Sequence, residues 1–139
     1  MDRKLELLAG VPLLARLDRK DLEAVGRLCD EVDLPAGKTV VTQGTYGTEF
    51  FVVIDGALRV EHDGSHLTDL GPGAFFGELA LLAKIQRTAT VVTTAPTRLL
   101  VMGAREFSTL LRDHPTIQAA VLHAVAERMA RLDSEHHTH

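Results

Sequence analysis

Residues 75–91 read FFGELALLAKIQRTATV. The order of residue types predicts a short strand, a tight turn at Gly77, one or two turns of helix, a loop and a second strand. Glycine at this point allows another part of the backbone, or a ligand, to approach closely. A helix that starts there presents free N–H groups, which attract anions. Because a helix inside a run of strands is unusual, we expect this segment to bind a ligand as well as pack.

Two charged side chains accompany this predicted anion site. Arg87 follows Glu78 by nine residues and is expected to face the same spot, where its planar guanidinium offers a fork for phosphate oxygens. Glu78 cannot bind phosphate, but a carboxylate suits a hydroxyl donor such as the ribose 2′-OH of a nucleotide. A carboxylate that accepts from a hydroxyl group, beside a cation that binds a phosphate, predicts a sugar phosphate or a nucleotide as the ligand.

Strands are predicted on both sides of this segment. Between residues 31 and 102, short apolar runs alternate with turn signals about every eight to twelve residues, which is typical of an antiparallel sandwich or barrel. Asp55-Gly56 suits a two-residue type I′ hairpin. No βαβ alternation is present, which excludes a Rossmann-like sheet. The runs expected to form strands are Lys38–Thr42, Phe50–Ile54, Ala57–Glu61, His66–Leu70, Ala89–Thr93 and Arg98–Met102.

Helical periodicity marks both ends of the chain. Residues 1–30 are predicted to form helices, with Asp18 as the N-cap of the second. Residues 104–133 are predicted to form two more, the last starting at Pro115, and residues 134–139 to be a tail. The last helix carries an apolar stripe at Leu122, Val125, Met129 and Leu132. The expected fold is a single α+β domain over residues 1–139: an antiparallel β-roll or jelly-roll barrel with a short phosphate-binding helix, flanked by these helices.

Composition excludes several classes of protein. The chain has 139 residues, 45% of them hydrophobic, and a net charge of −4, which does not fit a disordered chain. The single cysteine, Cys29, allows no internal disulfide. The acidic balance argues against direct DNA binding. No apolar run reaches the length of a membrane span, and the charged N-terminus does not resemble a signal peptide. A cytoplasmic location is expected.

The motif FGELAL at residues 76–81 followed by RTATV at 87–91 resembles the phosphate-binding cassette of the cyclic nucleotide-binding domain family. That family includes the catabolite activator protein, protein kinase A regulatory subunits and cyclic-nucleotide-gated channels. The segments LPAG at 34–37, QG at 43–44, FFVVIDG at 50–56 and LGPGAF at 70–75 resemble the strands, central hairpin and approach to the cassette. The resemblance covers about residues 10–132.

The resemblance implies a cyclic nucleotide, cAMP or cGMP, as ligand, with no cofactor, metal or catalytic residue. Glu78 would accept a hydrogen bond from the ribose 2′-OH, and Arg87 would pair with the cyclic phosphate. Thr88 would contact phosphate or base without settling which base is bound, and cAMP is favoured. The backbone around Gly77, Leu79 and Ala89 would assist, and Leu70, Phe75, Leu79 and Val91 would line the sugar and base. Lid candidates from the last helix are Leu122, Val125 and Arg128.

Three functions stay open from sequence. The first is a stand-alone sensor that signals through its C-terminal helices to an unknown effector protein or to a homodimer mate. The second is an interaction module of the same fold without nucleotide, or a fragment of a larger cyclic-nucleotide-regulated protein; the loop Lys84-Ile85-Gln86 departs from the family and puts affinity in question. The third is a metal-dependent cupin-like enzyme, for which Glu61, His62 and His66 are the candidate ligands.

Overall fold

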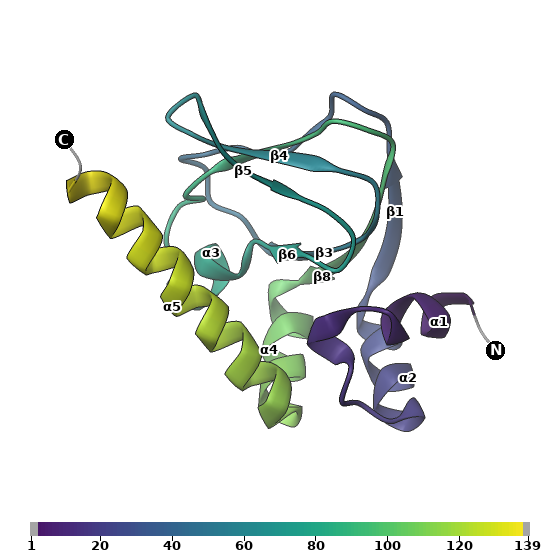
Figure 1. The fold of residues 1–139 in the computed structure, drawn as a ribbon. Coiled ribbons are helices and arrows are strands. Elements are labelled where there is room, and N and C mark those ends of the chain that lie inside the picture. Colours follow the sequence, from purple (N-terminus) through teal and green to yellow (C-terminus); the bar gives the residue numbers. More distant parts are fainter. Residues whose placement is uncertain (1–2, 138–139) are drawn as a thin grey trace.

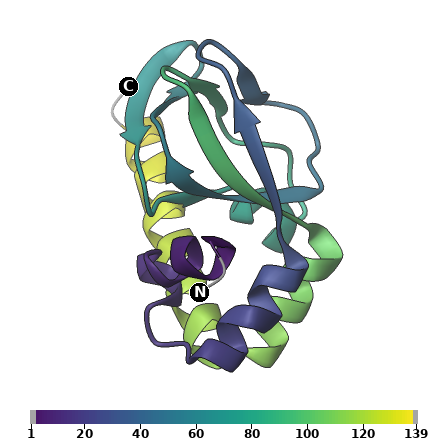
Figure 2. The same cartoon turned by 90° about the vertical axis from the view of Figure 1, so that its right-hand side faces the viewer.

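Two four-stranded antiparallel sheets lie against each other at one end of the molecule in the computed structural model (Figures 1 and 2). Most helices lie at the other end, and the last helix runs from there along the side of the sheets. The model describes residues 3–137, with the side chains of residues 3–130. The first sheet has the order β1 (Asp30–Leu34), β8 (Thr97–Gly103), β3 (Glu49–Asp55), β6 (Phe75–Phe76). The second has the order β2 (Thr39–Val41), β7 (Thr90–Thr93), β4 (Leu58–His62), β5 (Ser65–Leu70). This is the predicted α+β β-roll.

The helices begin largely where the sequence predicts. The carboxylate of Asp18 caps α2 by accepting a hydrogen bond of 2.9 Å from the backbone N–H of Asp21, and Pro115 begins α5. That last helix continues to His137, beyond its predicted end near residue 133. The side chain of Leu132 lies outside the described residues. The helices are α1 (Arg3–Ala9), a 3₁₀ helix η1 (Pro12–Leu14), α2 (Arg19–Leu28), α3 (Glu78–Leu82), α4 (Ala104–Asp113) and α5 (Pro115–His137).

Strand β3 separates two apolar cores. Because successive side chains of a strand point to opposite faces, Phe50 and Val52 pack among the helices, while Phe51 and Val53 pack between the sheets. Phe50 stacks on Phe107 of α4, with ring centroids 4.4 Å apart. A strand buried on both faces explains the unbroken apolar run from residue 50 to residue 54. No described helix has the length and apolar character that a membrane crossing requires.

The predicted hairpin at Asp55-Gly56 is wrong. Strands β3 and β4 lie in different sheets, so the chain crosses between sheets here instead of turning back along its own strand. Gly56 has φ +104°, and a Cβ on it would lie 2.6 Å from the carbonyl oxygen of Pro96. Gly56 therefore allows its own segment to pass close to the segment at Pro96. A type I′ turn needs two successive residues in the left-handed conformation. Asp63 and Gly64 have this conformation, and they connect the paired strands β4 and β5.

Strand β1 was not among the strands expected from periodicity. Its sequence DEVDL carries three acidic residues, which obscure the apolar alternation. The structure compensates two of these charges from the neighbouring strand, because Arg98 on β8 lies 3.2 Å from Glu31 and 2.8 Å from Asp33. β1 is an edge strand of its sheet, where exposed charge is common and discourages pairing with other chains.

Candidate nucleotide-binding site

A cavity of about 390 Å³ opens between the second sheet, the 75–91 segment and α5. Its size falls within the range of about 300–1,000 Å³ that is typical of small-molecule sites. All nine residues predicted to contact a ligand line it: Leu70, Phe75, Gly77, Glu78, Leu79, Arg87, Thr88, Ala89 and Val91. Residues far apart in the sequence therefore meet at one concave place, as the resemblance implied.

Gly77 shapes one wall of the cavity. It precedes α3 in the left-handed conformation, with φ +96°, which side chains other than glycine rarely adopt. A Cβ at this position would lie 2.8 Å from the carbonyl oxygen of Glu49 and 2.9 Å from Nη1 of Arg87. Glycine is therefore required both by the backbone conformation and by the close approach of the guanidinium.

Arg87 is held by backbone carbonyl groups. Its Nη1 donates to the carbonyl oxygen of Gly77 at 3.1 Å and its Nη2 to that of Glu49 at 2.9 Å. Burial lowers the pKa of Arg87 from its ordinary value, while the charges of Glu49 and Glu78 oppose this shift. The side chain is only 6% exposed. A guanidinium has five N–H donors, so the two carbonyl groups orient the cation and leave donors for an anion in the cavity.

Gly47 lies against Arg87, a contact that the sequence reasoning missed. A Cβ built on it would lie 2.0 Å from Nε and 2.1 Å from Nη2 of Arg87. The backbone of the same loop also holds Arg87, whose N–H donates to the carbonyl oxygen of Thr45 at 2.7 Å and whose carbonyl oxygen accepts from Gly44 at 2.9 Å. A glycine in a loop beside a conspicuous arginine gives no local sign of this contact, because the two are forty residues apart in the sequence.

Glu78 is fully buried and only partly satisfied. Its Oε1 forms a close ion pair with Nη1 of Arg128 on α5. Its Oε2 has no hydrogen-bond partner within the described part of the chain. A buried carboxylate oxygen without a donor is costly, and this one belongs to a side chain that lines the cavity. The site therefore offers a buried acceptor that suits a hydroxyl group of a ligand.

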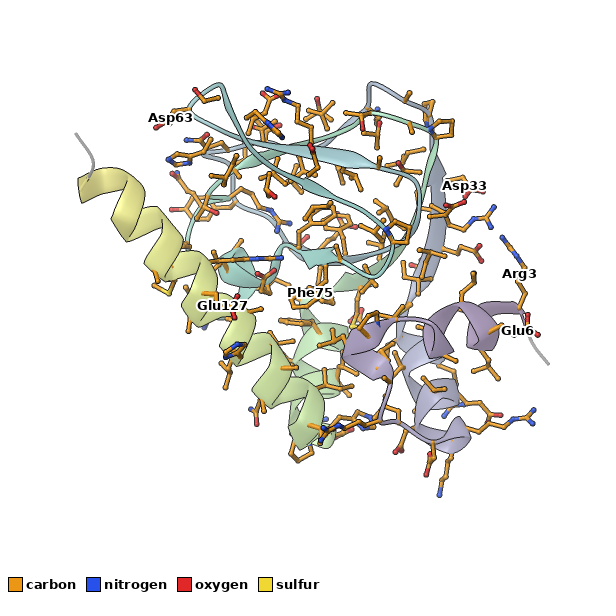
Figure 3. The ribbon with its side chains drawn as sticks, viewed as in Figure 1. Arg3, Glu6, Asp33, Asp63, Phe75 and Glu127 are labelled. Carbon is orange, nitrogen blue, oxygen red and sulfur yellow. The ribbon has the colours of Figure 1, made fainter. Side chains whose placement is uncertain are left out.

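Helix α5 covers the cavity with a different face than the sequence suggested. Of the three lid candidates, Arg128 lines the cavity, whereas Leu122 and Val125 do not. Leu122 is 51% exposed, and Val125 packs against the core among the helices. Ala124 and Glu127 take their place. Figure 3 shows Glu127 on α5 and Phe75 on β6 at the same end of the barrel.

Arg128 fixes α5 to the segment that contains Glu78. Its Nη2 donates to the carbonyl oxygen of Phe75 at 2.6 Å, and its guanidinium lies 5.2 Å from the centroid of the Phe75 ring. The Phe75 ring in turn lies 5.7 Å from that of Phe50. The same cation thus contacts a carboxylate, a carbonyl and an aromatic face, and it joins α5 to the cavity wall.

The candidate metal ligands do not converge. His62 pairs with Asp63 and with the carbonyl oxygen of Thr88, whereas His66 pairs with Asp69 at 2.9 Å. Among the described residues, no group of three or more His, Cys, Asp or Glu side chains is arranged to hold a metal ion. His66 thus bonds within its own hairpin, whereas His62 bonds to the segment that precedes β7.

Comparison with known proteins gives a consistent result. The family model "Cyclic nucleotide-binding domain" matches residues 31–114. A putative potassium channel protein of Rhodopseudomonas palustris is 30% identical over 128 residues, which cover 90% of this chain and 31% of the channel. A structure of cAMP-bound PfPKA-R (141–441) has a TM-score of 0.83 and 25% identity, and the match covers 94% of this chain and 45% of that one. The catabolite activator protein of Thermus thermophilus has a TM-score of 0.78 and 29% identity, covering 89% of this chain and 61% of the other.

These similarities cover nearly all of this chain but a smaller share of the relatives. The chain spans about a third of the length of the first curated relatives that it matches. The family model itself covers more than half of the chain, including β3 and the whole 75–91 segment. The matched region, the β-roll and the cavity agree, and the chain belongs to the cyclic nucleotide-binding domain family.

Proposed function

We propose that the chain is a regulatory domain, not an enzyme, that senses a cyclic nucleotide, with cAMP favoured over cGMP. The observation that carries the proposal is the convergence of Arg87 and Glu78 on one cavity of about 390 Å³. The free donors of Arg87 suit the cyclic phosphate, and the unpartnered Oε2 of Glu78 suits the ribose 2′-OH. The preference for cAMP is supported by the cAMP-bound PfPKA-R structure among the similar folds.

Signalling is proposed to run through α5. In the structure Arg128 already occupies Oε1 of Glu78, and a ribose hydroxyl on Oε2 would complete the hydrogen bonding of the same carboxylate. A ligand shifts a conformational equilibrium only through its different affinity for the two states. The state in which Arg128 holds α5 against Glu78 would bind the nucleotide more tightly, and the position of α5 would report occupancy to the rest of a longer protein or to an effector.

A homodimer through α5 is part of the proposal. Leu122 and Met129 are about half exposed, at 51% and 50%, and lie seven residues apart on the helix. Such spacing places them on the same face, as in a two-helix seam. Light scattering of the purified chain should give a dimer mass, and Met129→Glu should give the monomer mass while nucleotide binding persists. A monomer in both cases would contradict this part alone.

Isothermal titration calorimetry tests the central proposal. The wild-type chain should bind cAMP more tightly than cGMP, and both more tightly than 5′-AMP, which has an open, doubly charged phosphate. Arg87→Ala should cost about 2–5 kcal/mol, at least about thirtyfold in affinity, as for removal of one partner of a buried charge pair. Absence of heat and of thermal shift with every nucleotide at millimolar concentration would favour the interaction module without nucleotide.

Hydrogen exchange tests the signalling step. Amides of α5 near Arg128 should become more protected when cAMP binds, because the ligand favours the docked helix. Arg128→Ala should remove much of this difference, while the loss of affinity should be smaller than for Arg87→Ala. Unchanged exchange of α5 on saturation with cAMP in the wild-type chain would contradict signalling through this helix.

A further inference from the structure

The turn between β4 and β5 lies beside the residues that follow Arg87, because His62 at its start contacts the carbonyl oxygen of Thr88. Asp63 and Gly64 form this turn in the left-handed conformation, with φ +52° and +81°. Figure 3 shows Asp63 at the tip of the hairpin, on the opposite side of the molecule from Arg3 and Glu6 of α1. His62, the last residue of β4, points a ring nitrogen at the backbone that follows Arg87. Its role is not explained by the site described above, since His62 does not line the cavity.

A chain of polar contacts joins this turn to the residues after Arg87. Nδ1 of His62 lies 2.8 Å from the carbonyl oxygen of Thr88. Because a carbonyl oxygen only accepts, Nδ1 must carry the proton. The other ring nitrogen, Nε2, lies 3.4 Å from Oδ2 of Asp63. The imidazole is therefore held against the peptide of Thr88 by its Nδ1–H, and the carboxylate of the turn lies beside its other edge.

Gln43 fixes the turn from the opposite side. Its side-chain amide donates to Oδ1 of Asp63 at 2.7 Å and accepts from the backbone N–H of Asp63 at 2.8 Å. Its own backbone N–H donates to Oγ1 of Thr90 at 2.9 Å. Three segments that are distant in sequence, the loop after β2, the β4–β5 turn and residues 87–90, are thus connected by side-chain hydrogen bonds.

The contact with Thr88 has a consequence for the next residue. In a planar trans peptide the C=O of one residue and the N–H of the next point in opposite directions. Fixing the carbonyl of Thr88 toward His62 therefore turns the N–H of Ala89 away from the imidazole. Thr88 and Ala89 line the cavity, whereas His62 lies outside it.

We propose that His62, supported by Asp63 and Gln43, is a positioning residue that presets the Ala89 N–H as a donor to an anionic oxygen of the ligand. The inference rests on the proposed function and extends it to residues outside the cavity. The imidazole never touches the ligand. It removes the rotational freedom of one peptide, so that this donor need not be oriented when the anion arrives.

The test compares His62→Leu, which removes the donor, with His62→Asn, whose side-chain amide can replace Nδ1–H. We expect His62→Leu to weaken cAMP binding about three- to tenfold, the loss for one neutral hydrogen bond, and His62→Asn to restore affinity to within about twofold. Gln43→Ala, which releases Asp63, should weaken binding by a smaller factor. His66→Ala is the matched control, because His66 lies on the same hairpin but pairs with Asp69.

A second measurement separates this inference from the proposed function. In ¹H–¹⁵N spectra of the ligand-free chain, the Ala89 amide signal should move or broaden in His62→Leu and return in His62→Asn. This change is expected even if no nucleotide binds, which would overturn the proposed function alone. An unmoved Ala89 signal in His62→Leu, wild-type affinity of that variant, or an equal loss in His62→Asn or His66→Ala would overturn the positioning role. Should His62→Leu fail to fold, the Ala89 signal and affinity of Gln43→Ala decide.

Discussion

Substitution of Gly47 by alanine would test whether the placement of Arg87, and not only its charge, makes the site. The new Cβ would lie 2.0 Å from Nε of Arg87, 2.1 Å from Nη2 and 2.2 Å from Cζ. The φ of Gly47 is not in the left-handed region, so alanine causes no backbone strain. The atoms it meets are the end of a flexible side chain. We therefore expect the fold to persist and the guanidinium to be displaced.

The size of the effect follows from the bonds that depend on this placement. Displacement breaks the contacts of Arg87 with the carbonyl oxygens of Gly77 and Glu49, at 3.1 Å and 2.9 Å, and moves its remaining donors away from the anion. A hydrogen bond to a charged group contributes about 1.5–3 kcal/mol. Loss of one such bond to the ligand would weaken cAMP binding roughly 10- to 150-fold. The unfolding midpoint should fall by only a few degrees.

Calorimetry of four variants decides the matter. Gly71→Ala is the control, because a Cβ there meets nothing within 4 Å, and it should bind like the wild-type chain. Gly47→Ala should weaken binding, and it should add little in an Arg87→Ala background, since residues that act on one contact are not additive. Wild-type affinity of Gly47→Ala, or an equal loss when Arg87 is already alanine, would refute the reasoning.

Three further predictions concern buried side chains. The wild-type chain should bind cAMP at least about tenfold more tightly than 2′-deoxy-cAMP, and Glu78→Gln should reduce this ratio of affinities to nearly one. Competition binding measures the ratio, and an unchanged ratio would contradict the hydroxyl contact. Burial raises the pKa of Cys29 to about 11. As the pH rises, the thiol of the unfolded chain therefore ionises before that of the folded chain, and the free energy of unfolding should fall between about pH 9 and 11. Urea unfolding should show no such fall in Cys29→Ala, and equal pH dependence of the two chains would refute the prediction. Phe107→Ala should cost about 3–5 kcal/mol of stability, because Phe107 is 1% exposed and stacked on Phe50; a loss below 1 kcal/mol in the same assay would contradict its place in the core.

The 75–91 segment could be predicted closely because its information is local. A strand residue, a left-handed glycine and a short helix follow one another within a few residues of Gly77, and Arg87 returns to the same place a short distance later. The lid was harder. The periodicity of α5 identifies apolar stripes, but the phase at which the helix meets the barrel is set by tertiary packing, which brings Ala124 and Glu127 to the cavity in place of Leu122 and Val125.

Errors arose where distant segments decide the outcome. Asp55-Gly56 has the composition of a hairpin turn, but β3 pairs with β8 and β6 and never with β4, so a short connection became a crossing between sheets. The fit of Gly47 against Arg87 depends on the path of a loop that no local pattern describes. The unpartnered Oε2 of Glu78 depends on where Arg128 arrives from α5, fifty residues later.

The aromatic contacts around Phe75 extend the influence of Arg128 beyond the cavity. The guanidinium lies over the ring of Phe75, that ring lies beside Phe50, and Phe50 stacks on Phe107 of α4. Through these rings the arginine of α5 connects to α4, so the cavity wall and both C-terminal helices share one continuous series of side-chain contacts.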